Sequence, residues 1–480
     1  MSLQELLTKA YIGGSWRAGR GGTFPVYDPA TGEEITRVAD CTVEDLDEAI
    51  EAASEAYSSW RHTTVKQRAT LLHKIQVALL DNKDTIATTL TRENGKPKAE
   101  AAGEVMFAAS FFEWFAEETR RQYGETIPSA AATKRMITVR QPVGVAAVIT
   151  PWNFPIAMLA RKVSAALAAG CTCVIKPAED TPLVALAFAK VCESVGVPVG
   201  VVNVVPCSRG RVQQIGSRLC ESPKVHILSF TGSTAVGKWL YSRCGSTLKK
   251  VSLELGGDAP FIVFPSANMD TAIAGTMVCK FRNTGQTCVT ANRIFVHESV
   301  YEEFVSRLAK TMDSELKVGN GLDLGVNQGP IINQRQLERL DKMVRETVSA
   351  GAQVVRGGAS QGGLYYAPTL LTGVTPDMAL AKNEIFGPVA PIIKFSTEEE
   401  VVSLANTTDR GLAGYFYSND LSQVWRVAEA LEVGMVGVNE GLLSTCEAPF
   451  GGFKHSGLGK EGSKHGLDEY SNLKYICFGV

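Results

Sequence analysis

The run VGVAAVIT, residues 143–150, decides the fold class, because it opens a series of short β-branched segments separated by Gly or Pro. Segments long enough for helices lie between these runs, at 158–169, 183–194 and 212–219. Strands that alternate with helices predict a parallel, doubly wound sheet of the nucleotide-binding type. The later runs are TCVIKP (172–177), VGVVNVVP (199–206), VHILSF (225–230), KVSLEL (250–255) and PFIVF (260–264).

Further elements extend the pattern on both sides. Upstream, residues 43–59 and 64–80 have helical periodicity, and Thr42 with Asp45 forms a capping signal. After about Gly256 a second series of alternating helix and strand patterns begins, which predicts a second α/β domain. Residues 470–478 are strand-like beyond both domains, and we expect this strand to pair with another subunit. The second cycle has strand candidates at 368–374, 389–395 and 434–439, and helices at 298–316 and 334–350.

Composition narrows the kind of protein. The 480 residues suffice for roughly two to four domains of ordinary size, and 45% of them are apolar. The 48 Lys and Arg nearly balance 50 Asp and Glu, so no overall positive charge attracts nucleic acid or an anionic membrane. No apolar run approaches the roughly 18 residues that span a bilayer, and the N-terminus shows no secretory signal. We expect a soluble protein without nucleic-acid or membrane partners.

The number and spacing of the cysteines indicate the cellular compartment in which the protein resides. The chain has 11, an odd number, and no C-x-x-C pair, which disfavours a secreted disulfide framework and a zinc ribbon. We expect reduced thiols, no bound metal and a cytoplasmic location. None of the six histidines shows Ser-His-Asp or H-E-x-x-H spacing, which disfavours a His-assisted hydrolase and a zinc enzyme.

A glycine-rich turn follows the run 225–230. It satisfies G-x-x-x-x-G-K, but Trp239 stands where a phosphate loop needs a magnesium-binding Ser or Thr, which disfavours an NTPase. Backbone N–H groups at a helix N-terminus would still suit a pyrophosphate, although an ordinary strand-to-helix turn explains the pattern too. The turn consists of Gly232, Ser233, Thr234, Ala235, Val236, Gly237 and Lys238.

A second cofactor signal is the segment Lys176, Pro177, Ala178 and Glu179, directly after a predicted strand. The carboxyl ends of doubly wound strands present ligand groups. The Glu179 carboxylate could accept hydrogen bonds from adenosine ribose hydroxyls and would repel a 2′-phosphate, which favours NAD over NADP. Alternatively, Lys176 and Glu179 are solvated loop residues.

Three residues are candidates for the chemistry. Cys288 follows Gly285 in FRNTGQTC (281–288), among polar residues, and is a candidate nucleophile. Asn153, in a turn clamped by two prolines, is a candidate donor to an oxyanion. Glu254, between two leucines, is a candidate general base whose pKa an apolar setting would raise. Alternatively, Glu254 is a surface residue of an amphipathic strand.

Six short motifs, spread over nearly the whole chain, resemble those of the aldehyde dehydrogenase superfamily in their residues and in their order along the chain. Three longer segments are similar in sequence to the succinate-semialdehyde dehydrogenase subfamily, namely KFRNTGQTC (280–288), LAGYFYS (412–418) and EVGMVGVNEG (432–441). The motifs are TPWNFP (150–155), KPAE (176–179), SFTGSTAVG (229–237), LELGG (253–257), GQTC (285–288) and EIFGP (384–388).

The resemblance implies the α/β fold of that family and a homo-oligomer, either a dimer or a tetramer. It implies a Rossmann-type NAD-binding domain at 1–124 and 145–256 and an α/β catalytic domain at 257–455. A small β oligomerisation segment would comprise 125–144 and 456–480.

The resemblance also implies NAD-dependent oxidation of succinate semialdehyde to succinate, a reaction of GABA degradation. Cys288 would attack the aldehyde, and the Asn153 side chain with the Cys288 N–H would hold the oxyanion. After hydride transfer, Glu254 would deprotonate the water that hydrolyses the thioester. Besides the two segments described above, the implied cofactor-binding residues are Thr150, Pro151, Trp152, Leu255, Glu384 and Phe386.

For the distal carboxylate of the substrate, Arg161 and Arg282 match positions that the subfamily uses, and Ser444 matches their hydroxyl partner. Bidentate Arg suits a carboxylate better than Lys does. Arg282 could instead form a structural ion pair.

Several alternatives stay open. The substrate could be another semialdehyde, such as glutarate semialdehyde, or a broad range of aldehydes, with NAD or NADP. A catalytically inactive family member and a thiol hydrolase without redox chemistry are the other classes. Thr290 stands where animal-type relatives can carry a second cysteine, so we expect no disulfide switch in this loop. A mature form in the mitochondrial matrix is the alternative to a cytoplasmic location.

Overall fold

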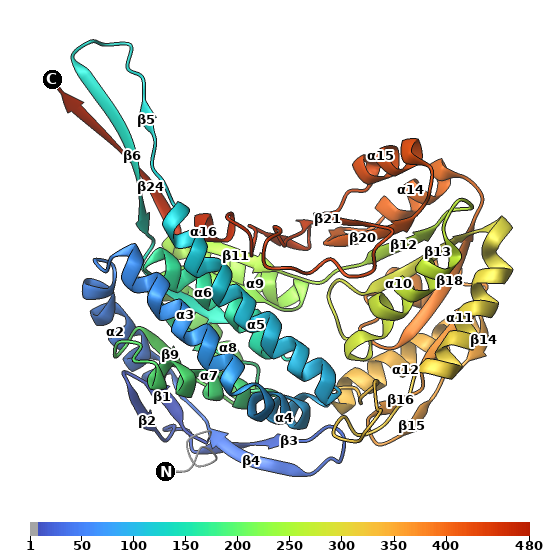
Figure 1. Ribbon diagram of the computed structural model, residues 1–480. Coiled ribbons are helices and arrows are strands. Elements are labelled where there is room, and N and C mark those ends of the chain that lie inside the picture. The colour runs from blue at the N-terminus through green and yellow to red at the C-terminus, as the bar shows by residue number, and fades with distance from the viewer. Residues whose placement is uncertain (1–7) are drawn as a thin grey trace.

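The computed structural model describes residues 8–480 of the chain. The interpretation of the N-terminus and the start of the predicted domain 1–124 fall partly on residues 1–7, which lie outside the described residues. Within 8–480 the chain forms two α/β lobes side by side, each around one large sheet, and a narrow arm that rises from the first lobe (Figure 1).

The sheet of the first lobe has eight strands among the described residues, in the order β2-β1-β9-β8-β7-β10-β11-β23. The central strands β7 to β11 are mutually parallel, which confirms the predicted parallel sheet. Short antiparallel strands extend both edges, and they are too short to leave an alternating pattern in the sequence. The strands are β1 (Ala10–Ile12), β2 (Ser15–Arg17), β7 (Val145–Ile149), β8 (Thr172–Lys176), β9 (Val202–Val204), β10 (Val225–Thr231), β11 (Lys250–Glu254) and β23 (Gly457–Leu458).

The strand order creates a switch point. From β7 the chain adds β8 and β9 on one side, and then returns to add β10 and β11 on the other. The loops after β7 and β10 therefore leave the sheet in divergent directions, and ligands of doubly wound sheets bind in such a crevice.

The packing of strand β7 explains why residues 145–149 are all apolar. Its alternate residues point to opposite faces of the sheet. Ala146 and Val148 pack into the core beneath α3, α5, α6 and α7, whereas Val145, Ala147 and Ile149 pack into the core beneath α2, α8 and α9. A strand covered on both faces needs apolar side chains at every position.

Helices cover both faces of this sheet (Figure 1). The predicted start of α2 is confirmed, since the backbone N–H of Thr42 donates to the Asp45 carboxylate at 2.9 Å. Helix α5 carries Phe and Ala on several faces and so lacks the single apolar stripe that would have predicted it. The helices are α2 (Val43–Trp60), α3 (Val65–Asp81), α4 (Lys83–Asn94), α5 (Lys98–Glu118), α6 (Pro155–Ala169), α7 (Leu183–Ser194), α8 (Val212–Glu221) and α9 (Thr234–Cys244), with short 3-10 turns at η1 (Thr119–Arg121), η2 (Arg209–Arg211) and η3 (Gly245–Thr247).

The second lobe contains a seven-stranded sheet among the described residues, in the order β14-β17-β18-β13-β12-β20-β21. All neighbours are parallel except the edge strand β14, and the predicted second α/β cycle is confirmed. Its strands are β12 (Ala259–Val263), β13 (Ala291–His297), β14 (Gln353–Arg356), β17 (Thr369–Thr372), β18 (Val389–Phe395), β20 (Ala413–Tyr417) and β21 (Met435–Val438). Its helices are α10 (Met269–Phe281), η4 (Arg282–Gly285), η5 (Glu298–Val300), α11 (Tyr301–Glu315), α12 (Gln334–Ser349), α13 (Ala379–Lys382), α14 (Glu398–Asn406) and α15 (Leu421–Ala430).

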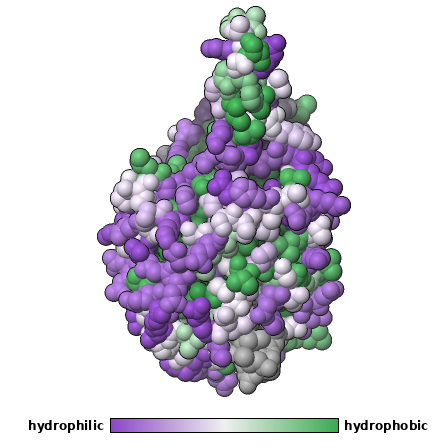
Figure 2. Space-filling view, turned by 90° about the vertical axis from the view of Figure 1, so that its left-hand side faces the viewer, coloured by the Kyte–Doolittle hydropathy of each residue, from purple (hydrophilic) through white to green (hydrophobic). Residues whose placement is uncertain are grey.

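The arm is a three-stranded antiparallel sheet that carries the C-terminus (Figure 1). Strand β24 (Ser471–Gly479) pairs along its whole length with β6 (Lys134–Pro142), and β5 (Thr126–Ile127) lies on the other side of β6. Strand β24 is thus an edge strand, and Figure 2 shows apolar residues among polar ones along the arm. The remaining elements are the strand pairs β3 (Thr23–Tyr27) with β4 (Glu34–Ala39), β15 (Ser360–Gly362) with β16 (Tyr365–Tyr366) and β19 (Arg410–Gly411) with β22 (Phe453–Lys454), and the helix α16 (Gly466–Glu469).

None of the helices described in residues 8–480 combines the length and the apolar character needed to cross a membrane.

Candidate active site

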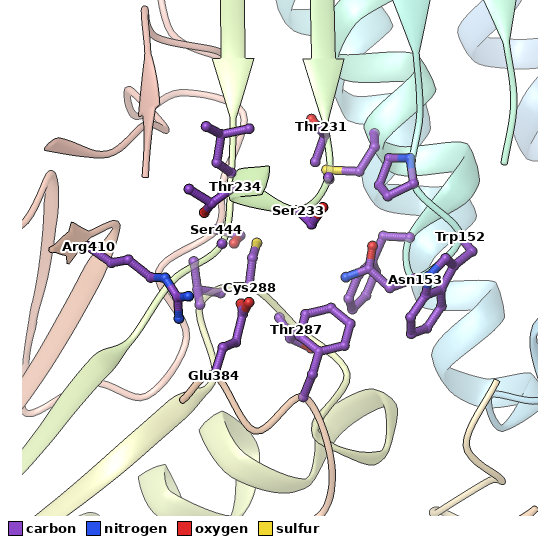
Figure 3. Close-up of a pocket in the computed structure, with 18 of the residues that line it drawn as sticks. Trp152, Asn153, Thr231, Ser233, Thr234, Thr287, Cys288, Glu384, Arg410 and Ser444 are labelled. Atoms are coloured by element: carbon purple, nitrogen blue, oxygen red, sulfur yellow. The ribbon is translucent and has the colours of Figure 1, made fainter. Parts of the chain in front are cut away.

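A cavity of about 350 Å³ lies where loops from the two lobes meet. The first lobe contributes the loops after β7 and β10, and the second contributes the loop before β13 and the segment before β18 (Figure 3). Fourteen of the predicted site residues line this cavity: Pro151, Trp152, Asn153, Arg161, Gly232, Ser233, Thr234, Ala235, Leu255, Arg282, Cys288, Glu384, Phe386 and Ser444. The structure does not place the others in its wall, namely Thr150, Lys176, Pro177, Ala178, Glu179, Val236, Gly237 and Glu254.

The loop that carries Cys288 has an unusual backbone. Asn283, Thr284 and Gly285 follow one another in the left-handed region, with φ of 50°, 57° and 71°. Gly285 is required there, because a Cβ at that position would lie 2.2 Å from the carbonyl oxygen of Gly387. Non-glycine residues at positive φ persist only where the surroundings hold them, and such residues are common at functional sites. The turn leads the chain directly to Cys288.

Cys288 is partly exposed to the cavity, and its sulfur points into it (Figure 3). Burial raises the pKa of the thiol to about 12, opposed by the Arg161 guanidinium and reinforced by Glu254. The cysteine is therefore a protonated thiol at neutral pH in the protein alone. As a nucleophile it requires a base or a bound positive charge.

Asn153 lies across the cavity from Cys288, and its amide is directed into the same space (Figure 3). Its Nδ2 donates to the Gln286 carbonyl oxygen at 3.0 Å, which ties it to the Cys288 loop. Its own carbonyl oxygen accepts from Lys96 Nζ at 2.7 Å and Asn283 Nδ2 at 3.0 Å. An amide N–H group held in this way can donate to a negatively charged oxygen that forms near the sulfur.

Glu254 ends β11 and is buried. The alternative of a surface residue on an amphipathic strand is therefore wrong. Burial, and next the nearby Glu461 carboxylate, raise the pKa of Glu254 well above its usual value, against the charges of Arg161, Lys162 and Lys460. Neither carboxylate oxygen has a hydrogen-bond partner among residues 8–480, so the group is free to accept a proton from water.

The glycine-rich turn between β10 and α9 has the shape of a phosphate cradle. Ser233 caps α9, since its Oγ accepts from the N–H of Val236 at 3.4 Å. A Cβ at Gly237 would lie 2.3 Å from the Leu255 side chain, so a glycine lets the helix approach β11 closely. Thr231 Oγ1 is buried beside the turn with no hydrogen-bond partner in the described residues. A dinucleotide pyrophosphate fits at this helix N-terminus, where N–H groups and the helix dipole favour an anion.

Lys176 and Glu179 lie outside the cavity, at the carboxyl end of β8, next to the switch point. Lys176 Nζ lies 3.5 Å from Glu179 Oε2, and Arg209 Nη1 lies 3.8 Å from Glu179 Oε1. Lys176 is buried, so the alternative of a solvated loop residue is wrong for Lys176, whereas Glu179 stays partly exposed. Arg209, which the sequence did not single out, places a positive charge beside the carboxylate.

Glu384 and Phe386 line the same cavity. The half-buried Glu384 accepts from the N–H of Gly257 at 3.0 Å, and desolvation raises the pKa of its carboxyl. Phe386 has a positive φ of 54°, and its ring meets that of Trp152 edge-on at 5.5 Å. Sequence reasoning missed several polar residues of this wall. Thr287 lies inside the GQTC motif but was not singled out, and the others lie outside the recognised motifs: Gln336, Arg339, Asn383 and Arg410.

Two arginines, Arg161 and Arg282, also line the cavity. Arg161 is buried, with its guanidinium carbon 4.0 Å from the centroid of the Phe450 ring and its Nη1 3.6 Å from Glu461 Oε2. Arg282 lies 5.3 Å over the Phe154 ring and forms no ion pair among residues 8–480, so the ion-pair alternative is wrong. Ser444 lies in the same wall. Cationic and aromatic groups around a narrow space suit a small organic acid.

A model of the aldehyde dehydrogenase family matches residues 16–476. The chain belongs to the aldehyde dehydrogenase family. It is 54% identical over 472 residues to the mitochondrial succinate-semialdehyde dehydrogenase of Rattus norvegicus, covering 98% of this chain and 90% of the relative. It is 49% identical to the glutarate-semialdehyde dehydrogenase of Pseudomonas aeruginosa, covering 98% and 97%.

Among solved structures, an NADP-dependent enzyme of E. coli superimposes with a TM-score of 0.97, at 48% identity over 98% of each chain. The predictions of the aldehyde dehydrogenase fold and of an aldehyde-oxidising enzyme are confirmed by these relationships. In this aldehyde dehydrogenase family member, no group of three or more His, Cys, Asp or Glu side chains within the described residues is arranged to hold a metal.

Proposed function

We propose that this protein oxidises succinate semialdehyde to succinate with NAD. The observation that carries the proposal is that one cavity is lined both by the Cys288 thiol and by the side chains of Arg161 and Arg282. A semialdehyde has an aldehyde and a carboxylate at opposite ends, so both of its functional groups find partners there. The rat relative named above carries the same activity in its name.

In the proposed mechanism, the Cys288 thiol releases its proton to solvent and its Sγ attacks the aldehyde carbon. The oxyanion accepts hydrogen bonds from Asn153 Nδ2 and the Cys288 N–H. Bound NAD supplies the acceptor for the hydride that the thiohemiacetal carbon loses. Glu254 then takes a proton from the water that attacks the resulting thioester. Cys288 leaves as a thiolate, and succinate is released.

For the cofactor we propose NAD as the preferred dinucleotide, held by the turn Gly232–Gly237, Trp152, Glu384 and Phe386. Lys176 and Glu179 would hold the adenosine ribose, and the Glu179 carboxylate would repel a 2′-phosphate. Arg209 beside Glu179 reduces that repulsion, so we expect a preference for NAD and not an exclusion of NADP. The similar E. coli enzyme is NADP-dependent.

The second candidate is the oxidation of glutarate semialdehyde, which is one methylene longer. The Pseudomonas aeruginosa relative favours it at 49% identity. One methylene in a pocket changes kcat/KM by about 10- to 200-fold, so the preference is measurable.

We also propose that the protein forms a homo-oligomer, either a dimer or a tetramer, that assembles through the β24 edge of the arm.

For the cellular location we propose the cytoplasm. The mitochondrial matrix is the alternative, because the rat relative is mitochondrial.

The test measures kcat/KM for succinate semialdehyde, glutarate semialdehyde and an uncharged aldehyde of similar length, each with NAD and NADP. We expect succinate semialdehyde with NAD to give the highest value. Arg161→Ala and Arg282→Ala should each lower it by about 10-fold or more for the acid substrates only, as expected for a lost charged hydrogen bond. An equal loss with the uncharged aldehyde would contradict the carboxylate assignment.

A further inference from the structure

Helix α5 connects the two loops that carry the proposed reactive groups. Its first turns present two carboxylates, Glu100 and Glu104, four residues apart and therefore on one face of the helix. Glu104 is buried and Glu100 is partly buried. Each reaches a different loop of the active site, although neither lines the cavity.

Glu104 holds the Asn153 side of the cavity. Its Oε1 accepts from the N–H groups of Ile156 and Ala157 at 3.1 and 3.2 Å, and so caps helix α6, whose own N-cap residue offers no side-chain acceptor. Its Oε2 forms an ion pair at 2.6 Å with the buried Lys96, whose Nζ donates to the Asn153 carbonyl oxygen. Glu104 and Lys96 thereby fix the backbone of the oxyanion loop and the first turn of α6, the helix that carries Arg161.

Glu100 holds the Cys288 side. Its Oε2 accepts from the N–H of Asn283 at 2.8 Å. Asn283 is the first of the three left-handed residues, and its Nδ2 donates to the carbonyl oxygens of Asn153 and Gln286 at 3.0 and 3.2 Å. The opposite side of this turn is held from the second lobe, where Thr284 Oγ1 donates to the Gly329 carbonyl oxygen at 3.0 Å. Glu100 is the contact by which α5 takes part in holding the strained turn.

We propose that Glu100 and Glu104, with Lys96, are positioning residues that set the distance and orientation between Asn153 and Cys288. None of the three lines the cavity, and their hydrogen bonds to the two loops and to α6 are made to backbone atoms. Lys96 Nζ also lies 3.9 Å from the centroid of the Phe154 ring. The proposal rests on the proposed roles of Cys288 and Asn153 and deepens them, because it assigns to α5 the alignment of nucleophile and oxyanion donor.

Glu100 is the position to test, since it is less buried than Glu104. Glu100→Ala removes the acceptor, and Glu100→Gln keeps an acceptor oxygen without the charge. Glu100→Asp keeps a carboxylate at the helix start but is too short to reach Asn283. Glu113→Ala, an exposed glutamate on the same helix, is the matched control.

We expect Glu100→Ala and Glu100→Asp to lower kcat by about 10-fold or more, the effect of losing one charged hydrogen bond, with KM nearly unchanged. Glu100→Gln should recover most of the activity, and all variants should keep the Tm of Glu113→Ala within a few degrees. Should Glu100→Ala not fold, the Asp and Gln pair still decides the outcome.

The proposal is overturned if Glu100→Asp retains the kcat of the wild type, if Glu100→Gln is as slow as Glu100→Asp, or if activity is lost only in step with Tm. The kcat loss should appear with both succinate semialdehyde and an uncharged aldehyde, because it acts through Cys288 and Asn153. If the wild type preferred the uncharged aldehyde, the proposed substrate would be refuted. The comparison of kcat among the Glu100 variants would still test the positioning role.

Discussion

At the scale of single residues, the surroundings of Cys288 and Glu254 oppose their charged forms. Both groups are desolvated, and burial is the largest cause of the raised pKa in each case. A thiol whose pKa is raised to about 12 carries little thiolate at neutral pH, and the thiolate is the nucleophile. We therefore expect Cys288 to react slowly in the protein alone.

The first prediction concerns the thiol. In the cofactor-free protein, alkylation of Cys288 by iodoacetamide should accelerate about tenfold per pH unit from pH 7 to 9, since the thiolate fraction rises in that proportion below a pKa of about 12. The rate is measured by mass spectrometry of the peptide that contains Cys288, with the exposed Cys477 as internal reference. A plateau below pH 8 would show that the resting thiol has a low pKa.

The second prediction concerns the base. Glu254→Gln should retain a first turnover of NADH formation but lose about 100-fold or more in steady-state kcat, because the acyl-enzyme is no longer hydrolysed efficiently. In the wild type, kcat should rise with pH at values above the usual titration range of a carboxyl, because burial raises the pKa of Glu254. Stopped-flow absorbance separates the two phases. Loss of the first turnover would place Glu254 in an earlier step.

At the scale of elements, Asn153 and Cys288 lie on loops, whereas Glu254 ends strand β11, and the loop of Cys288 is fixed by packing against its neighbours. The left-handed turn 283–285 abuts Gly387 in the segment that also carries Glu384 and Phe386. The turn before Cys288 and the segment of Glu384 and Phe386 thus pack closely against each other.

This contact gives the third prediction. Gly285→Ala should lower both Tm and kcat, because its Cβ would clash with the Gly387 carbonyl oxygen and a positive φ disfavours alanine. We expect a destabilisation of about 2 kcal/mol or more, measured by thermal and urea unfolding. Gly103→Ala in α5 is the control, since open space surrounds that position, and it should be neutral or stabilising. Equal behaviour of the two variants would mean that the turn tolerates a side chain.

At the scale of the whole molecule, the arm is the part of the fold that the core does not explain. Strand β24 buries little of its own surface, and Leu473 and Tyr475 are 57% and 56% exposed. A long edge strand with apolar side chains is a site for association.

The fourth prediction follows from that edge. The double substitution Leu473→Glu and Tyr475→Glu should shift the protein to a smaller species in analytical ultracentrifugation, because charges on an edge strand block pairing and apolar contact. Lys474→Glu, which changes the neighbouring residue on the other face of β24, should leave the assembly intact. Unchanged sedimentation of the double variant would assign the arm another role.

The sequence by itself determined the doubly wound sheet and many, but not all, of the residues that line the cavity. Strands such as β7 are apolar at every position because both faces are covered, and motif residues such as Asn153 and Cys288 stand beside recognisable turns. These signals are local, so a short stretch of sequence is enough to detect them.

Only the tertiary structure decided the rest. Glu254 could be a surface or a buried residue until β11 took its place in the sheet, and Arg209, Arg339 and Arg410 became site neighbours through contacts between distant segments. Glu100 meets Asn283 across 183 residues of chain. Burial, charge pairing and alignment depend on which segments pack together, and no short stretch of sequence contains that information.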